Sequence, residues 1–226
     1  MGAAADRAAL LAVLGVEIDA VLLETALTHR SYAYEHGTAD NERLEFLGDS
    51  VLGRAVTAML YATHEDEDEG ALAKRRAGLV STVALASIAR TLGLGTFLLL
   101  GRGEVLTRGA EKPSILADAV ESLIGATFLS AGSEAAEALV LRLVQPLVDD
   151  PASTGAITDP KTALQEEAAR RGAPPPAYEL AGEGPEHARV FTATVTVADV
   201  TATGTGTSKK QAEVAAAWEA YRALRA

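Results

Sequence analysis

Two carboxylate side chains interrupt an otherwise apolar segment of the sequence, ILADAVESLIGA at residues 115–126. Asp118 and Glu121 are three residues apart, and the segment contains no Lys or Arg with which they could pair. Residues at i and i+3 are neighbours on the surface of a helix. Because a buried, ionised carboxylate is costly unless it is paired, hydrogen-bonded or bound to a metal ion, this pair predicts one of those three arrangements.

A second group of acids lies in NERLEFLGDSVLGRAVTAML, residues 41–60, which has the apolar spacing of a helix. At about 100° per residue, Glu42, Glu45 and Asp49 share one narrow arc of that helix. A solvent-exposed arc is the commoner explanation for three such acids, but the apolar flanks here favour a functional cluster. The flanking residues are Phe46, Leu52 and Val56, and the residues on the opposite side are Leu44, Leu47, Val51, Ala55 and Ala58.

Packing of these two helices against each other would bring four or five carboxylates together. Their mutual repulsion then requires a cation. Oxygen ligands without His or Cys are typical of Mg²⁺ or Mn²⁺, and Mg²⁺ commonly shares its coordination sphere with phosphate. We therefore expect a Mg²⁺ site, in which Mn²⁺ can substitute, that serves phosphoryl chemistry. The acidic run EDEDEG at 65–70 is by itself typical of a solvated loop.

The elements that position these acids fall into two regions. Residues 1–148 have helical spacing of apolar residues, and residues 149–158 are small and polar with Pro and Gly, as in a linker. Residues 159–226 read as helix, three strands and helix. We predict an all-α domain followed by a small α+β (α-β-β-β-α) domain. Breaks in the helical pattern are expected near residues 36–40, 65–70 and 101–113.

Composition and charge further limit the kinds of site, partner and location that this protein can have. The absence of cysteine excludes disulfides, zinc–thiolate sites and thiol nucleophiles. The net charge of −11 argues at face value against a nucleic-acid partner. Residues 158–226, however, carry eight Lys or Arg against nine Asp or Glu, a net charge of −1. The remaining residues carry 12 Lys or Arg against 22 Asp or Glu, a net charge of −10. The amino terminus lacks the features of a signal peptide, and no apolar stretch reaches the about 18 residues of a membrane span. We expect a soluble, cytoplasmic protein with no membrane partner.

The decamer NERLEFLGDS, residues 41–50, closely resembles the signature of ribonuclease III, the family of double-strand-specific endoribonucleases. Three segments near the carboxyl terminus resemble a double-stranded-RNA-binding domain: TDPKTALQE, GPEHARVFTATV and GTGTSKKQAEVAAA. The resemblance implies the bacterial architecture, with a nuclease and dimerisation domain at 1–148, a linker at 149–158 and an RNA-binding domain at 159–226. Further matching segments are ALTHRSYAYE, DEGALAKRRAGLVS, LLGRGE and KPSILADAVESLIGA.

The resemblance also assigns roles to the acids of the first domain. Asp49 and Glu121 are implied to be the catalytic pair. Glu42 and Glu69 match two further acids of the family's cleavage region, and Asn41 is expected to hold a carboxylate or the RNA backbone in place. The implied metal ligands are Glu45, Asp49, Asp118 and Glu121.

In the second domain the resemblance implies contacts to A-form RNA along one side of the duplex. His187 is expected in one minor groove, and Lys209 and Lys210 on the phosphates across the intervening major groove. We expect Trp218 and Tyr221 to pack in the core. The residues expected in the other minor groove are Thr162, Gln165 and Glu166.

The activity implied by the resemblance is that of a homodimer whose two centres each cut one strand. Mg²⁺-dependent hydrolysis would leave 5′-phosphate and 3′-hydroxyl ends with short 3′ overhangs, on ribosomal RNA precursors and structured messenger RNAs. A non-cleaving double-stranded-RNA-binding regulator is the main alternative, and the intact acids argue against it. A metal-dependent phosphohydrolase acting on nucleotides would leave the C-terminal module unexplained.

Two features depart from the family pattern. Arg75 occupies a position where the family more often has an apolar residue, which could alter the local packing. The net charge of −1 is low for an RNA-binding domain, although binding depends on where the basic residues lie.

Overall fold

The computed structural model describes residues 2–149, 159–184 and 189–225, and the chain divides into two compact units, Met1–Asp149 and Asp150–Ala226. Residues 150–158 of the expected linker and the expected RNA contact His187 lie outside the described residues.

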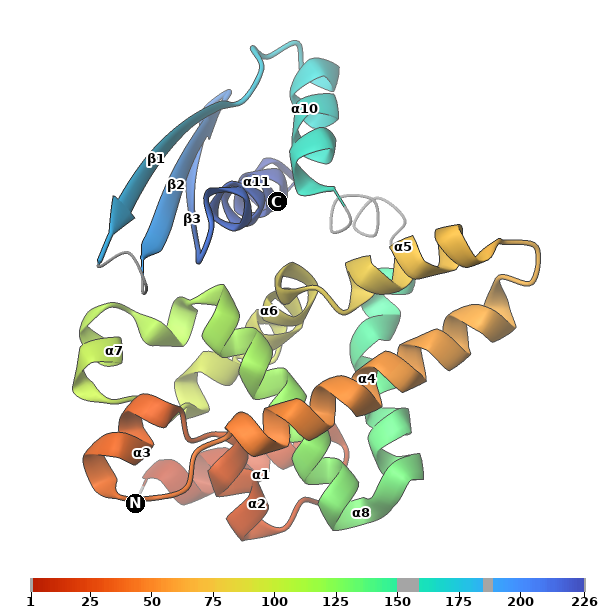
Figure 1. Ribbon diagram of the computed structural model, residues 1–226, viewed down its shortest axis with the longest axis vertical. Coiled ribbons are helices and arrows are strands. Elements are labelled where there is room, and N and C mark those ends of the chain that lie inside the picture. Colours follow the sequence, from red (N-terminus) through yellow and green to blue (C-terminus); the bar gives the residue numbers. More distant parts are fainter. Residues whose placement is uncertain (1, 150–158, 185–188, 226) are drawn as a thin grey trace. The chain divides into compact units, whose positions relative to one another are not determined.

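The first unit is built from helices throughout its described residues, which confirms the predicted all-α domain (Figure 1). Its α-helices are α1 (Gly2–Leu14), α2 (Ala20–Ala26), α3 (Arg30–His36), α4 (Glu42–Thr63), α5 (Glu69–Leu79), α6 (Thr82–Thr91), α7 (Arg102–Leu106) and α8 (Pro113–Asp149). Two 3₁₀ turns, η1 (Leu94–Phe97) and η2 (Gly109–Glu111), complete the unit. The expected break at 101–113 therefore contains α7 and η2.

Helix α8 forms the centre of the first unit and packs against α4 and α6. Its segment 115–127 is almost completely buried, apart from the two acids that interrupt it. Gly132 has φ 87° and ψ 176°, so the helix is interrupted there and continues in a second segment. Contrary to expectation, α8 is long and apolar enough to cross a membrane by length and composition, but 61% of its apolar window is buried inside the protein, as in a core helix.

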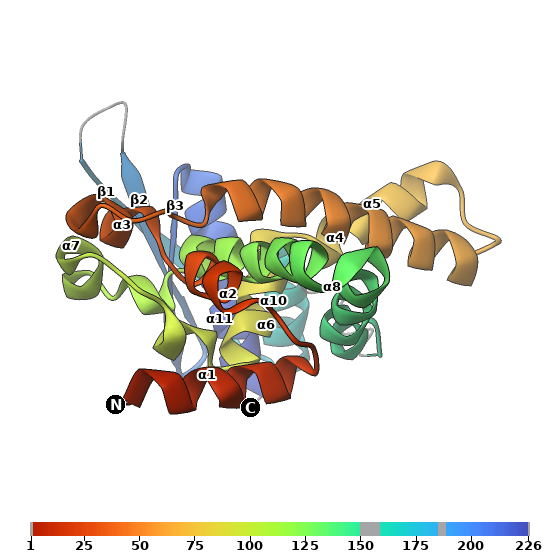
Figure 2. The same ribbon diagram turned by 90° about the horizontal axis from the view of Figure 1, so that it is seen from below.

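Helices α4 and α8 cross where each has a glycine (Figures 1 and 2). A Cβ atom on Gly48 would lie 1.8 Å from the carbonyl oxygen of Glu121, and one on Gly125 would lie 2.2 Å from the carbonyl oxygen of Leu44. Real Cβ atoms do not approach other atoms so closely, so each of these positions requires glycine. The backbones of α4 and α8 are therefore in contact close to the acids that each helix carries.

The helices at one end of the first unit are held together by side-chain caps. Helices α3 and α7 lie side by side (Figure 2). Ser31 Oγ accepts a hydrogen bond from the Gly101 amide at 2.9 Å, and Glu35 Oε1 accepts one from the Arg102 amide at 2.8 Å. These bonds fix α7 against α3 directly beside the start of α4.

The unexpected arginine of α5, Arg75, is accommodated by an acid of the preceding loop. Its Nε and Nη2 atoms donate to the two carboxylate oxygens of Glu67 at 2.6 and 2.5 Å. The bidentate pair lowers the pKa of Glu67 through the hydrogen bonds from Arg75. Instead of disturbing an apolar contact, Arg75 closes the loop that leads into α5.

The second unit contains α10 (Pro160–Arg170), three strands and α11 (Lys209–Arg225), which confirms the predicted α-β-β-β-α order. The strands β1 (Ala177–Glu183), β2 (Val190–Val197) and β3 (Val200–Gly206) form an antiparallel sheet in the order β1-β2-β3. Alternate residues of β2 (Ala193, Val195 and Val197) are buried on the sheet face that packs against α11. The threonines between them pair with threonines of β3 on the other face, as in Thr194 opposite Thr203.

Helix α11 approaches β3 as closely as α4 approaches α8. A Cβ atom on Gly204 would lie 2.2 Å from the backbone nitrogen of Ala216. Trp218 and Tyr221 are buried on this helix, as expected. The start of α11 is set by Gln211, whose Oε1 accepts from the amide and the hydroxyl of Thr207 at 3.0 and 2.6 Å.

Candidate metal centre and nucleic-acid interface

Three of the predicted metal ligands converge at the crossing of α4 and α8. Oxygen atoms of Glu45, Asp118 and Glu121 all lie within 4.8 Å of one another, and the three side chains are half-buried. Asp49 lies outside this triangle on the exposed side of α4, but its charge acts on Glu121. Glu42 is also exposed, and its charge acts on Glu45 and Asp118.

Two buried polar residues brace the backbone beneath the carboxylates. Ser122 Oγ lies 2.7 Å from the carbonyl oxygen of Asp118 and 3.3 Å from that of Asn41. Asn41 is 4% exposed, its amide donates to the Thr28 carbonyl at 3.0 Å, and its side chain donates to the carbonyl of Ala26 at 3.5 Å. Asn41 thus supports the start of α4, and its side-chain nitrogen is directed to the Ala26 carbonyl. Its expected role in holding a carboxylate or the RNA backbone stays a prediction.

Burial and mutual repulsion raise the pKa values of the converging acids. Burial raises the pKa of Glu121 to about 8, and the charges of Asp49, Asp118 and Glu45 add to this. Burial likewise raises the pKa of Asp118 to about 6, while the charge of Arg30 lowers it. The pKa of Glu45 is raised by burial first and by Asp118 next. Groups with pKa values shifted in this way are typical of functional sites.

The donor set fits a hard divalent cation. The cluster offers carboxylate oxygens and no His or Cys, which suits Mg²⁺ or Mn²⁺ better than zinc. A cation among the oxygens would stabilise the ionised carboxylates against the burial and the repulsion that raise their pKa values. Glu45, Asp118 and Glu121 are placed to hold such an ion, with Asp49 next to them.

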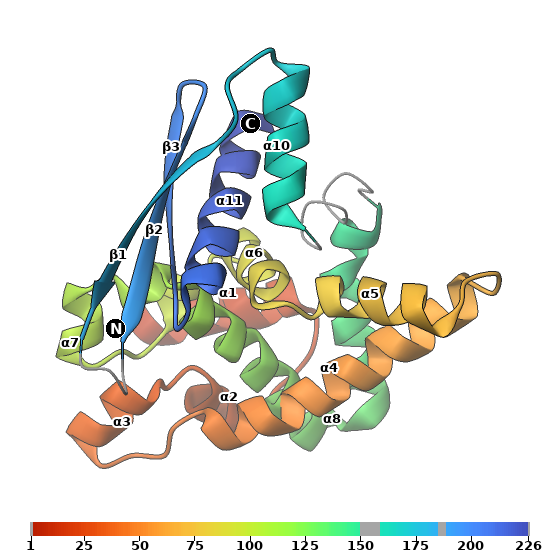
Figure 3. The ribbon, with the colours of Figure 1, turned by 45° about the horizontal axis from the view of Figure 1, so that its top comes forward.

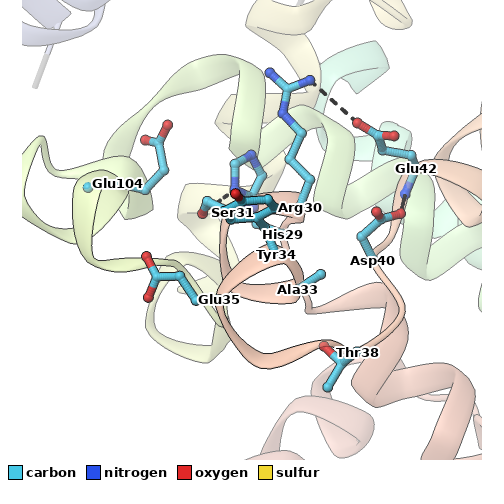
Figure 4. A pocket seen from close by; sticks show the side chains of 11 residues that line it. His29, Arg30, Ser31, Ala33, Tyr34, Glu35, Thr38, Asp40, Glu42 and Glu104 are labelled. Atoms are coloured by element: carbon cyan, nitrogen blue, oxygen red, sulfur yellow. Dashed lines mark hydrogen bonds and ion pairs between the residues drawn. The ribbon is translucent and has the colours of Figure 1, made fainter.

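A pocket of about 670 Å³ opens beside the cluster, between α3 and α7 (Figure 4). Arg30 lies on its rim and approaches Glu42, with Nη1 3.5 Å from Oε1. Burial lowers the pKa of His29, another residue of the lining, and the Nδ1 atom of His29 lies 2.8 Å from Ser31 Oγ. The pocket is thus lined by residues of the segment ALTHRSYAYE together with Glu42 at the start of α4.

Glu69 is far from the cluster within one chain. It is the exposed first residue of α5, which begins beside the carboxyl-terminal end of α4 (Figure 3). Thr63 lies 18 positions after Glu45 on α4, about 27 Å away at the rise of an α-helix. The structure thus brings together Glu45, Asp118 and Glu121, with Glu42 and Asp49 beside them, but not Glu69.

The RNA contacts expected in the second unit lie on exposed surfaces. Thr162, Gln165 and Glu166 lie exposed at i, i+3 and i+4 on α10, and Thr162 also donates to the helix cap Asp159, with Oγ1 2.8 Å from Oδ2. Lys209 and Lys210 are exposed in the first turn of α11. Helices α10 and α11 pack against each other and begin at the same end of this unit (Figure 3).

Two acids of the second unit form ion pairs with basic residues of the same unit. Glu213 pairs with Lys161 at 2.6 Å, and buried Glu167 binds Arg170 and Arg171, both at 2.6 Å. Within the described residues of this unit, Lys209 and Lys210 make no such pair. Lys209 and Lys210 are therefore available for an RNA contact, whereas Lys161, Arg170 and Arg171 are engaged with acids.

Sequence reasoning missed four residues that shape the first site: Gly48, Gly125, Ser122 and Arg30. A glycine inside a helix costs about 1 kcal/mol relative to alanine, so the glycines in LGDS and LIGA were a usable signal for close helix packing. Ser122 and Arg30 gave no comparable signal, because their roles depend on contacts between elements distant in sequence.

Comparisons with known proteins agree with this geometry. A family model described as Ribonuclease-III-like matches residues 19–147, and one described as Double-stranded RNA binding motif matches residues 160–224. Ribonuclease 3 of Leifsonia xyli subsp. xyli is 61% identical over 226 residues, covering 99% of this chain and 95% of the relative. Ribonuclease 3 of Nocardia farcinica is 53% identical, covering 100% and 96%.

The first unit also resembles a solved structure. The nuclease domain of ribonuclease III from Campylobacter jejuni superimposes with a TM-score of 0.58 and 45% identity, covering 61% of this chain and 94% of that one. The two family matches, the near full-length relatives and the carboxylates on the crossed helices all agree. The chain belongs to the ribonuclease III family of double-strand-specific endoribonucleases, with a helical nuclease domain followed by a double-stranded-RNA-binding domain.

Proposed function

We propose that this chain hydrolyses double-stranded RNA at a Mg²⁺ site whose ligands are Glu45, Asp49, Asp118 and Glu121. The observation that carries the proposal is the triangle of carboxylate oxygens within 4.8 Å on two helices whose backbones touch. The raised pKa values of Asp118 and Glu121 support it, because half-buried carboxylates next to other acids are stabilised by a bound cation. Mn²⁺ is expected to substitute for Mg²⁺.

The protein residues bind and orient the reacting groups. Glu45 and Asp118 would hold the cation from the two crossed helices, with Asp49 and Glu121 as the proposed catalytic pair. A divalent ion held there supplies positive charge that lowers the pKa of water and stabilises charge at phosphorus. Since the cluster contains no Lys, His or Cys, no covalent intermediate forms. The products would carry 5′-phosphate and 3′-hydroxyl ends.

We propose that the chain consists of a nuclease domain at residues 1–148, a linker at 149–158 and an RNA-binding domain at 159–226. Lys209 and Lys210 would hold phosphates at the start of α11, where the helix dipole adds to their charge. The A-form shape and the 2′-hydroxyls would be read in successive minor grooves. Those minor-groove contacts are assigned to Thr162, Gln165, Glu166 and His187.

The exposed face of α4 supports a homodimer. Phe46 is 79% exposed and Tyr61 76% exposed, and Ser50 and Thr57 lie between them on the same side of the helix. We infer that a second copy of the chain covers these two exposed aromatic side chains. The Campylobacter jejuni nuclease domain has a region described as involved in dimer formation.

A cleavage role for Glu69 also requires a second copy of the chain, because one chain cannot bring Glu69 to the carboxylate cluster. Two centres in such a dimer would cut both strands and leave short 3′ overhangs.

Replacing Phe46 with Asp tests the dimer. We expect light scattering during size exclusion to give twice the chain mass for the wild type and one chain mass for Phe46→Asp. Leu106→Asp is the control, because Leu106 is 85% exposed on α7, away from this face, and should leave the mass unchanged. If Phe46→Asp is still a dimer, this face of α4 is not the dimer interface.

The cleavage assay separates the enzyme from a non-cleaving regulator. Purified protein is incubated with a long RNA duplex, with and without Mg²⁺, beside Glu121→Gln and with single-stranded RNA of the same length. We expect fragments only in the lane that contains the duplex, the wild-type protein and Mg²⁺. Duplex binding without fragments in every lane would establish the regulator. Ribosomal RNA precursors and structured messages in the cytoplasm are the proposed natural substrates.

A further inference from the structure

Lys161 of α10 is a cation of the second unit that the proposed RNA contacts do not include. It begins the buried stripe of this helix, since Leu164 and Ala168 follow it at i+3 and i+7 and are buried. Its Nζ atom reaches the neighbouring helix α11, where it lies 2.6 Å from Glu213 Oε2. The two helices begin at the same end of the unit, so this ion pair joins their first turns (Figure 3).

The pair between Lys161 and Glu213 is supported by a third element. Lys161 Nζ lies 4.8 Å from the centroid of the Tyr178 ring on β1, which is a cation–π contact. Burial raises the pKa of Tyr178 to about 12, and the charge of Glu213 adds to this effect. The Lys161 side chain is 38% exposed and that of Glu213 is 22% exposed. The strand and both helices therefore hold the Glu213 carboxylate on the side that faces α10.

Glu213 is also a helical neighbour of the two lysines assigned to the RNA phosphates. It follows Lys209 by four residues and Lys210 by three. An acid and a base at these spacings are close enough to pair on the surface of a helix. Lys209 and Lys210 are nevertheless exposed, and neither forms an ion pair with any described residue of this unit. The carboxylate that could engage them is occupied by Lys161 instead.

We propose that Lys161 is a positioning residue for RNA capture, because it holds the Glu213 carboxylate away from Lys209 and Lys210 and so leaves both lysines available to the phosphates. Lys161 acts through Glu213 and does not touch the RNA. It also balances a negative charge that would otherwise repel the bound phosphate. This inference rests on the proposed RNA contact of Lys209 and Lys210 and adds the residue that keeps this contact open.

A double-mutant cycle on Lys161 and Glu213 tests the inference. Duplex binding is measured by fluorescence anisotropy on the full chain in low salt, in the Glu121→Gln background to prevent cleavage. Lys161→Gln should raise Kd about fivefold, because it leaves an unpaired carboxylate beside the phosphate contact. Glu213→Gln alone should leave Kd unchanged or lower it by up to about twofold. Glu213→Gln combined with Lys161→Gln should return Kd to within about twofold of the wild-type value.

The double variant distinguishes this role of Lys161 from two others. If Lys161 binds RNA itself, Glu213→Gln does not rescue Lys161→Gln. If the pair only ties α10 to α11, Glu213→Gln alone weakens binding as much as Lys161→Gln does. Either result overturns the inference. Lys161→Gln should also lose its effect when Lys209 and Lys210 are both replaced by Gln, and a fivefold effect that persists there would overturn the inference as well.

Two further variants serve as controls. Lys161→Arg should bind the duplex like the wild type, since a guanidinium also pairs with Glu213. Arg170→Gln removes a positive charge from the other end of α10, and its partner Glu167 keeps a second partner in Arg171. Its Kd should stay within about twofold of the wild-type value.

Failure of this inference is separable from failure of the proposed function. A wild type that does not bind the duplex would refute the proposed function. A variant with Gln at both 209 and 210 that binds as tightly as the wild type would refute the proposed phosphate contact. If the wild type binds through these lysines and Lys161→Gln leaves Kd unchanged, the inference about Lys161 alone is refuted.

Discussion

Glu121 and Asp118 set the electrostatic character of the nuclease unit. Both carboxylates are drawn out of water by the packing of α4 on α8, and burial is the largest cause of their raised pKa values. A raised pKa means that the folded chain binds protons more tightly than the unfolded chain. Without metal, proton uptake is the available way to reduce the repulsion, so protons and divalent ions compete for the same oxygens.

This competition predicts how metal-free stability depends on pH. The unfolded pKa of Glu121 is near 4.5 and its folded pKa is about 8. Its destabilising effect is therefore absent below about pH 4.5, grows as pH rises and is complete above about pH 8. We expect Tm in a chelator to fall across this range and the fall to be much smaller for Glu121→Gln. Differential scanning calorimetry at half-unit pH steps measures both curves.

Glu134→Gln is the control, because Glu134 is exposed in the later segment of α8 and carries the same change of charge. Its Tm should follow the wild-type curve. Saturating Mg²⁺ should raise the wild-type Tm most at high pH, where protons no longer compete. A wild-type Tm in chelator that rises steadily from pH 5 to 8 would contradict the assigned repulsion.

At the level of elements, helical spacing in the sequence was sufficient to predict which helices carry the acids. The arc of Glu42, Glu45 and Asp49 lies at one edge of the buried side of α4, and Leu52 and Val56 are buried next to it. Of the apolar residues opposite the acids, Leu44, Val51 and Ala55 are buried, whereas Ala58 is exposed. One helix considered alone gives the directions of its side chains but not the position of its neighbour.

The crossing of α4 and α8 is therefore the part of the site that sequence periodicity could not supply. Contacts such as Gly48 against the Glu121 backbone join residues 73 positions apart. The kink at Gly132 was not anticipated either, because a single glycine is compatible with a continuous helix. The order of the second unit was easier to predict, because alternation in β2 and the glycines of β3 are local signals.

Gly48→Ala tests whether the close crossing positions the carboxylates. The new methyl group would overlap the Glu121 carbonyl, so the helices must separate, which should cost about 1–3 kcal/mol in the free energy of unfolding by urea. Separation should also weaken Mn²⁺ binding, because the oxygens of Glu45 would move away from those of Asp118 and Glu121.

Gly53→Ala provides the control in the same helix. A Cβ atom there meets nothing within 4 Å, so alanine should be neutral or stabilising by about 0.5–1 kcal/mol. Equal unfolding curves for Gly48→Ala and Gly53→Ala would show that α4 and α8 can separate without cost, and the geometric basis of the site would then be lost.

At the level of the whole molecule, charge is divided according to the proposed task of each unit. The acidity of the chain is concentrated in the nuclease unit, where it serves cation binding. The RNA-binding unit pairs Glu167 and Glu213 with its own cations and exposes Lys209 and Lys210 at the start of α11. An acidic protein can therefore bind an acidic polymer, provided that binding and hydrolysis use different surfaces of the chain.

This division predicts that Lys209→Gln combined with Lys210→Gln impairs capture of the duplex and spares the chemistry. Two lost phosphate contacts should lower the slope of log Kd against log salt by about two units, because each contact releases roughly one counterion. Fluorescence anisotropy of a labelled duplex, measured in the Glu121→Gln background to prevent cleavage, gives this slope.

At saturating RNA in low salt, the double variant with Glu121 intact should cleave at nearly the wild-type kcat. Arg222→Gln removes a charge that is already paired with Glu219 at the other end of α11, and should leave the slope unchanged. If the double variant instead lost kcat at saturating RNA, Lys209 and Lys210 would have to act on the cleavage step, and the two functions would not be separable between the units.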